Sequence, residues 1–320
     1  MKVFNNILEY KKVPKAIVTI GTFDGVHRGH QAILKSMVKM AKETGGESVV
    51  VTFYPHPRQV LNIDSSHLRF INTQEDKIKL IEKTGIDNLI IINFTKEFSR
   101  TLSEDFILNY IVKRIEPVKI IIGYDHHFGK NRMGDFSMLF ELGLQYHFKV
   151  ERIPAQDVDN IAISSTKIRH SLQQGDIRLA NKLLGYEYSY SGTVIHGAEV
   201  GHILGYKTAN LELKQEYFMI EEPGVFAAYA DFDDMTYPAM VYTGQRPTLD
   251  DNRPKSLEAH IINYEGDLYG KNIRLRFIDK IRDEHKFNNL QELEQQIETD
   301  EKKIREVLEA YEKNNNQFNK

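Results

Sequence analysis

The chain has 320 residues, of which 41% are hydrophobic and 27% are charged, and its formal net charge is −3. This length exceeds that of a typical single domain and predicts two domains, each with its own hydrophobic core. The near balance of charges gives no reason to expect a nucleic acid or an anionic membrane as partner, so small-molecule ligands fit better. The absence of cysteine excludes disulfides, thiolate metal sites and a cysteine nucleophile.

The apolar segments of the chain are short. The first ten residues lack an apolar core of signal-peptide length, and runs such as Leu89-Ile-Ile-Ile92 are the size of a strand. We therefore expect a cytoplasmic protein with no membrane partner, which also agrees with the lack of cysteine.

Strand-like and helix-like segments alternate from residue 16 to about residue 184. A βαβα alternation predicts a mostly parallel sheet with helices on both faces, in a Rossmann-like α/β domain that binds its ligand at the carboxyl ends of the strands. Thr73 and Asp76 form a variant capping box at the start of one helix, and Gly85 ends that helix. The expected strands are 16–20, 48–53, 88–93, 118–122 and 147–152, and the expected helices are 31–42, 74–84, 103–115 and 136–143.

Beyond residue 186 the pattern changes to short β-rich runs separated by turn signals. This predicts a small antiparallel β-barrel, and an apolar stripe over 289–312 predicts a helix docked on it. We therefore expect an α/β domain over residues 1–186 and a β-barrel domain over residues 187–320. The expected strands of the barrel are 189–195, 224–230, 237–243, 257–264 and 271–278.

The segment Gly21-Thr-Phe-Asp-Gly-Val-His-Arg-Gly-His30 joins the first expected strand to the first expected helix. Glycines let the backbone approach a phosphate, and a helix N-terminus offers N–H groups and the positive end of a dipole. His27 and His30 can donate hydrogen bonds to phosphate oxygens. The segment therefore predicts a nucleotide site, although an isolated pair of histidines at this spacing is more often a cap or a core feature.

The same segment resembles the H-x-G-H loop of nucleotidyltransferases. In particular, the segment resembles the corresponding loop of the bacterial bifunctional riboflavin kinase/FAD synthetase family at Gly21, Phe23, Asp24 and Gly25. The resemblance implies an FMN adenylyltransferase, in which the FMN phosphate attacks the α-phosphorus of ATP and pyrophosphate leaves. Such a reaction needs alignment and charge stabilisation rather than a protein nucleophile.

Two further segments resemble signatures of that family. Val51-Thr-Phe-Tyr-Pro-His-Pro-Arg58 implies that His56 lies beside the nucleotide, although an ordinary turn would explain its prolines equally well. In the loop 121–134 the resemblance places Asp125 and Arg132 at the nucleotide. His126 replaces the usual phenylalanine there. With His127 it suggests a metal pair, which we disfavour because neighbours in an extended loop point apart.

Ile163-Ser-Ser-Thr-Lys-Ile-Arg169 resembles the fourth signature and opens a helix. An N-cap is one interpretation, and it is compatible with an anion site at the same helix start. Lys167 or Arg169 can stabilise negative charge on a triphosphate. The expected nucleotide contacts here are Ser164, Ser165 and Thr166, and Arg169 is expected to act in catalysis with His27, His30 and Mg²⁺.

The segment 196–211 resembles the glycine-rich loop of riboflavin kinases. Thr208 and Asn210, two residues apart on an extended segment, can turn two neutral oxygens toward one Mg²⁺. Two residues depart from the family: His202 replaces an arginine, and Lys207, which can reach a nucleotide phosphate, replaces a proline. The remaining expected ATP contacts are Gly197, Gly201 and Gly205.

Two other glycine patterns carry no function. The glycines of 197–205 are not a membrane helix-packing motif, because the segment is polar. Gly266-Asp-Leu-Tyr-Gly-Lys271 is not a P-loop, because one residue is missing between its glycines and Asn272 stands at the magnesium position.

Ser256-Leu-Glu-Ala-His-Ile261 contains a candidate general base, Glu258. In the family the glutamate of this strand takes the proton of the riboflavin hydroxyl, and the resemblance implies that role for Glu258. Without the resemblance, a solvent-facing strand residue would be the favoured interpretation. Arg282, Glu284 and Phe287 are expected to border the flavin.

These observations predict a bifunctional enzyme that converts riboflavin to FMN and FMN to FAD, with ATP as co-substrate of both steps and Mg²⁺ as cofactor. Two alternatives remain open. One is a flavin-binding or regulatory protein with a decayed kinase module, which Thr208, Asn210 and Glu258 argue against. The other is an adenylyltransferase for another acceptor, which leaves the β-barrel without a purpose. Oligomeric state, channelling and the preferred flavin redox state stay open.

Overall fold

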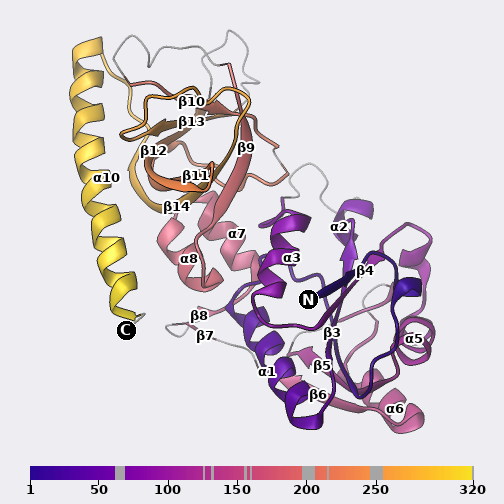
Figure 1. Cartoon of the computed structure of the whole chain (residues 1–320). Coiled ribbons are helices and arrows are strands. Elements are labelled where there is room, and N and C mark those ends of the chain that lie inside the picture. Colours follow the sequence, from indigo (N-terminus) through magenta and orange to yellow (C-terminus); the bar gives the residue numbers. More distant parts are fainter. Residues whose placement is uncertain are drawn as a thin grey trace. The chain divides into compact units, whose positions relative to one another are not determined.

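The computed structural model describes residues 1–61, 69–124, 127–130, 133–154, 157–158, 161–196, 206–214, 216–245 and 255–318, apart from the side chains of 245, 255 and 315–318. The chain forms two compact units, Met1–Ser165 and Thr166–Lys320 (Figure 1).

The first unit is an α/β domain around a six-stranded sheet of order β1-β4-β3-β2-β5-β6, in which every pairing is parallel. A separate two-stranded ribbon pairs β7 with β8. The elements in chain order are β1 (Lys2–Phe4), η1 (Ile7–Glu9), β2 (Ala16–Ile20), α1 (Arg28–Thr44), β3 (Ser48–Tyr54), α2 (Pro57–Val60), α3 (Gln74–Glu82), β4 (Asn88–Asn93), η2 (Phe98–Arg100), α4 (Ser103–Phe106), the π-helical η3 (Ile107–Val112), α5 (Lys113–Ile115), β5 (Pro117–Gly123), α6 (Phe136–Tyr146), β6 (Lys149–Ile153), β7 (Asp157–Val158) and β8 (Ile161–Ala162).

Helices cover both faces of this sheet, which explains why its central strands are mostly apolar and buried. All five residues of β2 are buried. Alternate strand residues enter two separate cores. One core packs Ile17 and Val50 against Leu34 and Met37 of α1. The other packs Val18 and its neighbours against α4, η3 and α6.

The order of the strands places a topological switch point at β2. The chain runs from β2 to β3 and β4 on one side and then returns to place β5 on the other side. Ligands of open parallel sheets bind beside such a point, at the carboxyl ends of the strands. Residues 21–27 follow β2 and lead into α1, and we call this segment the histidine loop. The fold therefore places the histidine loop at the expected ligand site.

The sequence predicted the first unit well, with corrections at the ends of its elements. The strand 16–20 is confirmed. The helix expected at 31–42 begins at Arg28, and the helix expected at 103–115 contains a π-helical turn. In the Pro-His-Pro segment, Pro55 and His56 form a short connection after β3, and Pro57 begins the short helix α2. The edge strand β1 was not predicted.

The second unit is a closed antiparallel barrel with helices around it. Its strands follow the order β10-β13-β12-β11-β14-β9, and β10 pairs with β9 to close it. Phe226, Phe277 and Tyr188 are its largest fully buried side chains. The elements are α7 (Ser165–Gln173), α8 (Ile177–Leu184), β9 (Ser189–Ile195), β10 (Ala209–Leu211), β11 (Gly224–Phe232), β12 (Met235–Gln245), β13 (Lys255–Ile261), β14 (Asn272–Asp283) and α10 (Leu290–Phe318).

The helix α10 runs along the outside of the barrel, as expected from the sequence, and is longer than the predicted 289–312 (Figure 1). Ile304 and Leu308 pack against Val225 and Ile278 of the strands beneath. The strands expected at 257–264 and 271–278 are shifted to Lys255–Ile261 and Asn272–Asp283. The three-residue β10 was not predicted.

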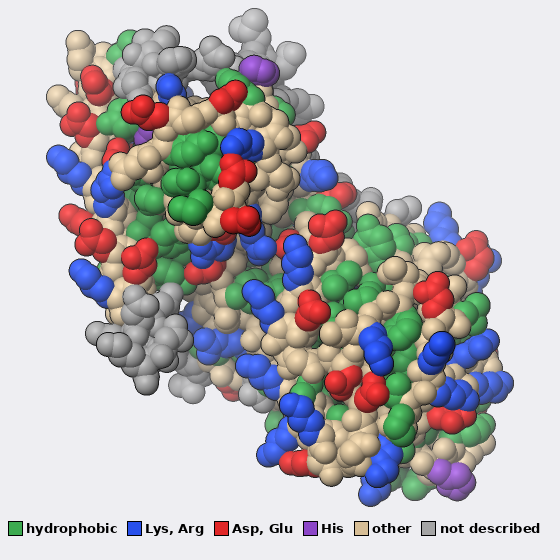
Figure 2. All heavy atoms as spheres, in the orientation of Figure 1, with side chains coloured by type: hydrophobic (Ala, Val, Ile, Leu, Met, Phe, Trp, Pro, Cys, Tyr) green, Lys and Arg blue, Asp and Glu red, His purple; other side chains and the backbone are tan. Residues whose placement is uncertain are grey.

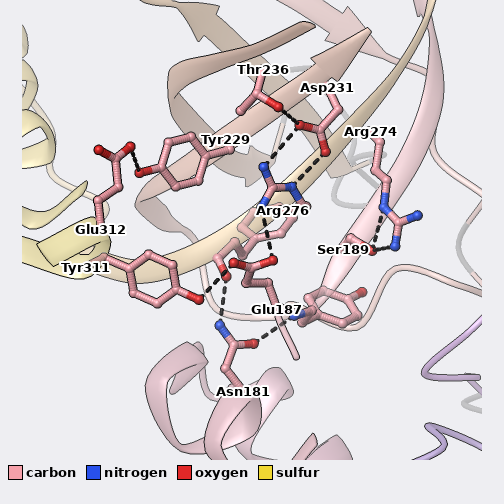
Figure 3. A network of polar contacts seen from close by, with 12 residues as sticks. Asn181, Glu187, Ser189, Tyr229, Asp231, Thr236, Arg274, Arg276, Tyr311 and Glu312 are labelled. Atoms are coloured by element: carbon pink, nitrogen blue, oxygen red, sulfur yellow. Dashed lines mark hydrogen bonds and ion pairs between the residues drawn. The ribbon is translucent and has the colours of Figure 1, made fainter. Parts of the chain in front are cut away.

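A polar network ties α10 and α8 to the barrel (Figure 3). The guanidinium of Arg276 donates to both carboxylate oxygens of Asp231, at 2.7 and 3.1 Å, and to Glu187 at 3.0 Å. Burial alone would lower the pKa of Arg276, but these carboxylates outweigh it and raise that pKa. Tyr311 of α10 donates to Glu187 at 2.8 Å, so the network reaches the C-terminal helix.

Helix α8 and all of α7 after its first residue, Ser165, belong to the second compact unit. The side-chain amide of Asn181 donates to the carbonyl of Phe277 at 2.8 Å and accepts from the N–H of Tyr188 at 2.7 Å. The contacts thus divide the chain after Ser165, whereas the sequence pattern changes near residue 186. The boundary at 186/187 stays a prediction about where each function resides.

Two candidate nucleotide sites

His27 and His30 lie together at the start of α1. His27 is the N-cap, and its Nδ1 accepts a hydrogen bond from the backbone N–H of His30 at 3.3 Å. The two imidazole rings stack with centroids 3.7 Å apart and planes 14° apart, and Phe23 meets the His30 ring edge-on at 5.1 Å. The cap and the anion site expected from the sequence therefore occupy the same helix end.

This cap determines which nitrogen of His27 can serve a ligand. Because Nδ1 accepts the N–H of His30, the proton of the neutral ring lies on Nε2, which can donate. The first N–H groups of an α-helix have no intrahelical acceptor, so those of Arg28 and Gly29 are directed out of the end of α1. A Cβ on Gly29 would lie 3.2 Å from Nδ1 of His27, so glycine leaves room for the capping ring.

The loop before the cap has an unusual backbone. Phe23, Gly25 and Val26 all have positive φ, at 50°, 84° and 32°. A Cβ on Gly25 would also lie 2.9 Å from Cδ1 of Ile71, which is buried. Non-glycine residues adopt this region only where the surroundings impose it, and such strain is concentrated at functional sites. Phe23 and Val26 are both buried, so packing holds this loop in shape.

Asp24 holds the loop through its own contacts. Its carboxylate accepts the backbone N–H of Ile71 at 3.1 Å, and its carbonyl accepts the hydroxyl of Ser165 at 2.9 Å. Its side chain is buried. The structure therefore brings two predicted nucleotide residues, Asp24 and Ser165, together as neighbours.

Lys77 is a candidate site residue that the sequence did not reveal. It belongs to α3, is only 7% exposed, and its ammonium donates to the carbonyl of Thr22 at 3.3 Å. Burial lowers the pKa of Lys77 to about 8, although the charge of Asp24 opposes that shift. The only signal for Lys77 in the sequence is that a charged residue occupies a position on the buried side of its helix.

The other predicted residues of this site lie on other elements of the chain. Nδ1 of His56 caps α2 by accepting the N–H of Arg58 at 3.2 Å, and its ring meets Phe70 at 4.8 Å. Ser164 directly precedes α7. Thr166, Lys167 and Arg169 are on α7 in the second unit. Asp125, His126 and Arg132 lie outside the described residues.

In the second unit, three neighbouring strands align the predicted kinase residues. Glu258 of β13 stands opposite Asn210 of β10 on one side and opposite Tyr242 of β12 on the other. Directly opposite residues of antiparallel strands project to the same face, with Cβ atoms about 5 Å apart. The predicted base is therefore a direct neighbour of a predicted metal ligand.

Thr208 and Asn210 fit a hard divalent cation. Asn210 is 6% exposed, and Thr208 lies two residues before it, a spacing that places side chains on the same side of an extended segment. The donor set is a hydroxyl oxygen and an amide oxygen next to the carboxylate of Glu258, which are ligands that suit Mg²⁺. Within the described part of the chain, no three His, Cys, Asp or Glu side chains gather as a separate metal cluster.

One of the predicted flavin residues, Glu284, contacts this face through Tyr242. The hydroxyl of Tyr242 donates to Glu284. Burial, the hydrogen bond to Glu284 and the charge of Glu258 all raise the pKa of Tyr242, so it stays a neutral donor. Arg282 lies 5.7 Å from the ring of Phe287 and pairs with the buried Asp300 of α10 at 2.8 Å. Tyr242 was missed because only strand register shows it beside Glu258.

Lys207 precedes Thr208, and its side chain is exposed. Its carbonyl lies 2.9 Å from Nδ1 of His260. The other predicted ATP contacts, Gly197, Gly201 and Gly205, and the departure His202, lie outside the described residues.

On the face shown in Figure 2, the described residues form no large patch of only positive or only negative side chains. Lysine, arginine, aspartate and glutamate side chains are interspersed there over both units (Figure 2). No helix among the described residues has the length and apolar character needed to cross a membrane.

Comparison with known proteins agrees with this two-part architecture. Residues 10–167 match the FAD synthetase family model, and residues 184–308 match the riboflavin kinase family model. The first match contains the histidine loop, and the second contains Asn210, Tyr242 and Glu258.

Two curated relatives span nearly the whole chain, and both are named bifunctional riboflavin kinase/FMN adenylyltransferase. The one from Buchnera aphidicola subsp. Schizaphis graminum is 38% identical over 94% of this chain and 96% of its own length. The one from Listeria monocytogenes is 33% identical over 90% and 91%. This chain belongs to the bifunctional riboflavin kinase/FMN adenylyltransferase family, as an enzyme with a FAD synthetase domain and a riboflavin kinase domain.

A solved structure from Streptococcus pneumoniae has the same fold over almost the whole chain. It aligns with a TM-score of 0.85 at 28% identity and covers 95% of this chain and 98% of that one. It is named a macrolide-efflux protein. That name is not carried over to this chain, because both family models and the curated relatives agree on flavin chemistry.

Proposed function

We propose that this chain phosphorylates riboflavin to FMN in its barrel unit and adenylylates FMN to FAD at its histidine loop, using ATP in both steps. The substrates are small molecules, the functional boundary lies near residue 186, and the protein acts in the cytoplasm. Neither a nucleic acid nor a membrane takes part.

The adenylyl transfer joins two phosphates without a protein nucleophile. A phosphate oxygen of FMN attacks the α-phosphorus of ATP, the bond to the bridging oxygen breaks, and pyrophosphate leaves. The Nε2–H of His27 and the N–H groups at the start of α1 donate to the phosphate oxygens that gain charge. His30 is stacked on His27 and would keep that ring in place while it contributes its own donor. Arg169 and Lys167 would supply positive charge for the departing pyrophosphate.

The phosphoryl transfer needs a base because the hydroxyl of riboflavin is a poor nucleophile. The carboxylate of Glu258 takes the hydroxyl proton while the oxygen attacks the γ-phosphorus of ATP, and ADP leaves. Thr208 and Asn210 would hold Mg²⁺, which supplies charge neutralisation on the phosphates when bound. Arg282, Glu284 and Phe287 would border the flavin, with Tyr242 as a neutral donor between Glu284 and Glu258.

One observation supports this assignment most strongly. The strand register places Glu258 directly beside Asn210, although the two residues are 48 positions apart in the sequence. A base must lie within hydrogen-bond reach of the hydroxyl whose oxygen attacks the metal-bound phosphate. An exposed glutamate on an unrelated strand would not meet that condition.

The direct test is incubation of the protein with riboflavin, ATP and Mg²⁺, followed by chromatography of the flavins. We expect FMN to form first and FAD to follow. Supplying FMN with ATP tests the second step alone. A protein that forms neither FMN nor FAD would contradict the proposal, and formation of FMN alone would favour a different acceptor for the adenylyl group.

A further inference from the structure

His260 makes a contact that neither reaction step above uses. It lies on β13 two residues beyond Glu258, and its Nδ1 is 2.9 Å from the carbonyl oxygen of Lys207. Lys207 directly precedes the predicted metal ligand Thr208. An imidazole nitrogen thus contacts the backbone directly before Thr208 and Asn210, the two predicted metal ligands.

The chemistry of the two atoms fixes the direction of this hydrogen bond. A carbonyl oxygen can only accept, so Nδ1 of His260 carries the proton and donates. Both the Nδ1-protonated neutral ring and the imidazolium offer that proton. The contact therefore persists in either charge state of the ring.

The same ring also contacts the residue before Lys207. The ring of Tyr206 meets His260 edge-on, with centroids 5.2 Å apart and planes at 72°. From Ala209 onward the segment is held by the ladder to β13, where Ala209 pairs with Ala259 and Asn210 with Glu258. Thr208 lies between the ring contacts and the ladder, so it is fixed from both sides.

This second anchor matters because β10 has only three residues. A strand of that length is held by few ladder hydrogen bonds, and its first residue is prone to fray. Thr208 precedes even that first residue. The bond from His260 to the carbonyl of Lys207 therefore restrains the backbone on the side of Thr208 that the ladder does not reach.

We propose that His260 is a positioning residue of the riboflavin kinase site, which holds the carbonyl of Lys207 so that Thr208 and Asn210 are preorganised for metal-bound ATP. This proposal depends on the proposed kinase function. The resemblance of 196–211 to the riboflavin kinase loop implies a proline at position 207, and the lysine of this chain has no ring to restrict its φ. His260 supplies a non-covalent restraint at that same residue.

The test compares three substitutions that separate the two ring nitrogens. In His260→Asn the amide nitrogen can occupy the place of Nδ1, in His260→Gln it lies nearer the place of Nε2, and His260→Ala has no donor. The first readout needs no substrate: hydrogen exchange of the amides of residues 206–211 in the nucleotide-free protein. We expect exchange to rise about five- to tenfold in His260→Ala and His260→Gln, the effect of one ordinary hydrogen bond, and to change little in His260→Asn.

The second readout is kinase kinetics, since preorganisation affects binding more than chemistry. In His260→Ala and His260→Gln the KM for ATP should rise about five- to tenfold with a smaller change in kcat, and His260→Asn should restore it. Adding Lys207→Pro to His260→Ala should recover part of the loss. FAD formation from supplied FMN is the internal control and should be unchanged in every variant.

Two results would overturn the proposal. One is wild-type exchange at 206–211 in His260→Ala, which would mean that the bond does not restrain the segment. The other is faster exchange with an unchanged KM for ATP, which would mean that the restraint does not serve the nucleotide. If the wild-type protein forms no FMN, the proposed function itself fails, and hydrogen exchange still reports on the restraint.

Discussion

The first unit builds its candidate site from backbone conformation, whereas the second builds its own from side chains on neighbouring strands. In the first, one continuous segment turns through three positive-φ residues and ends at the cap of α1. In the second, Asn210, Tyr242 and Glu258 come from three strands and meet only through register. A glycine substitution in the loop of the first site should therefore act through the shape of the backbone, whereas a side-chain substitution in the second site should act through the loss of a single group.

Glu258→Gln should cause the largest effect and is confined to the second site. The amide cannot accept the hydroxyl proton, so FMN formation from riboflavin should fall by a factor on the order of a thousand. FMN supplied directly should still become FAD at the wild-type rate. Kinase turnover equal to wild type would remove Glu258 as the base.

His30→Ala should have the opposite effect, because it should impair FAD formation at the first site and leave FMN formation intact. It removes one donor and the ring stacked on His27, so FAD formation should fall by about a hundredfold. FMN should then accumulate from riboflavin, as measured by chromatography. A parallel fall in FMN formation would show that the two reactions do not use separate sites.

Gly25→Ala tests whether the loop acts through its backbone. At φ +84° an added Cβ is strained and meets Cδ1 of Ile71, so FAD formation should fall about tenfold while FMN formation is retained. Gly45→Ala is the matched control, because Gly45 has φ +65° but no atom within 4 Å of an added Cβ. Equal losses of FAD formation in both variants would mean that the loop shape is not specific to the site.

Lys77 allows a finer test through pH. Its pKa is lowered to about 8 in the folded protein by burial, so between pH 8 and its ordinary value the unfolded chain binds more protons. Stability should therefore rise with pH across that window, by up to about 3 kcal/mol relative to Lys77→Met. Thermal unfolding of both proteins from pH 7 to 10 measures this, and a pH-independent difference between them would contradict the buried charge.

The sequence predicted those features of the fold and the sites that depend on residues close together in the chain. The apolar strand before Gly21 and the helix after it are periodic, so the turn that holds His27 and His30 could be placed. The sequence did not reveal partners that only tertiary pairing creates. Tyr242 and His260 look like ordinary strand residues until the pairing of β13 with β12 and with β10 is known.

Two other omissions have similar physical causes. Lys77 lies on an amphipathic helix, where lysine is usually solvated, but here it is buried and donates to the carbonyl of Thr22 in the segment after β2. The strand β10 has only three residues, which is too few for an alternating pattern to be recognised in the sequence, and all three are buried. Both features depend on what packs against them rather than on their own sequence.

The central claim is that one chain carries two independent active sites, and mixing two inactive variants tests it most directly. Neither Glu258→Gln nor His30→Ala should convert riboflavin to FAD at an appreciable rate. In a mixture supplied with riboflavin, ATP and Mg²⁺, His30→Ala should release FMN that Glu258→Gln converts to FAD. Recovery of FAD formation, measured by chromatography, is the predicted result. A mixture that still makes no FAD, although each variant retains its own half-reaction, would contradict independent sites.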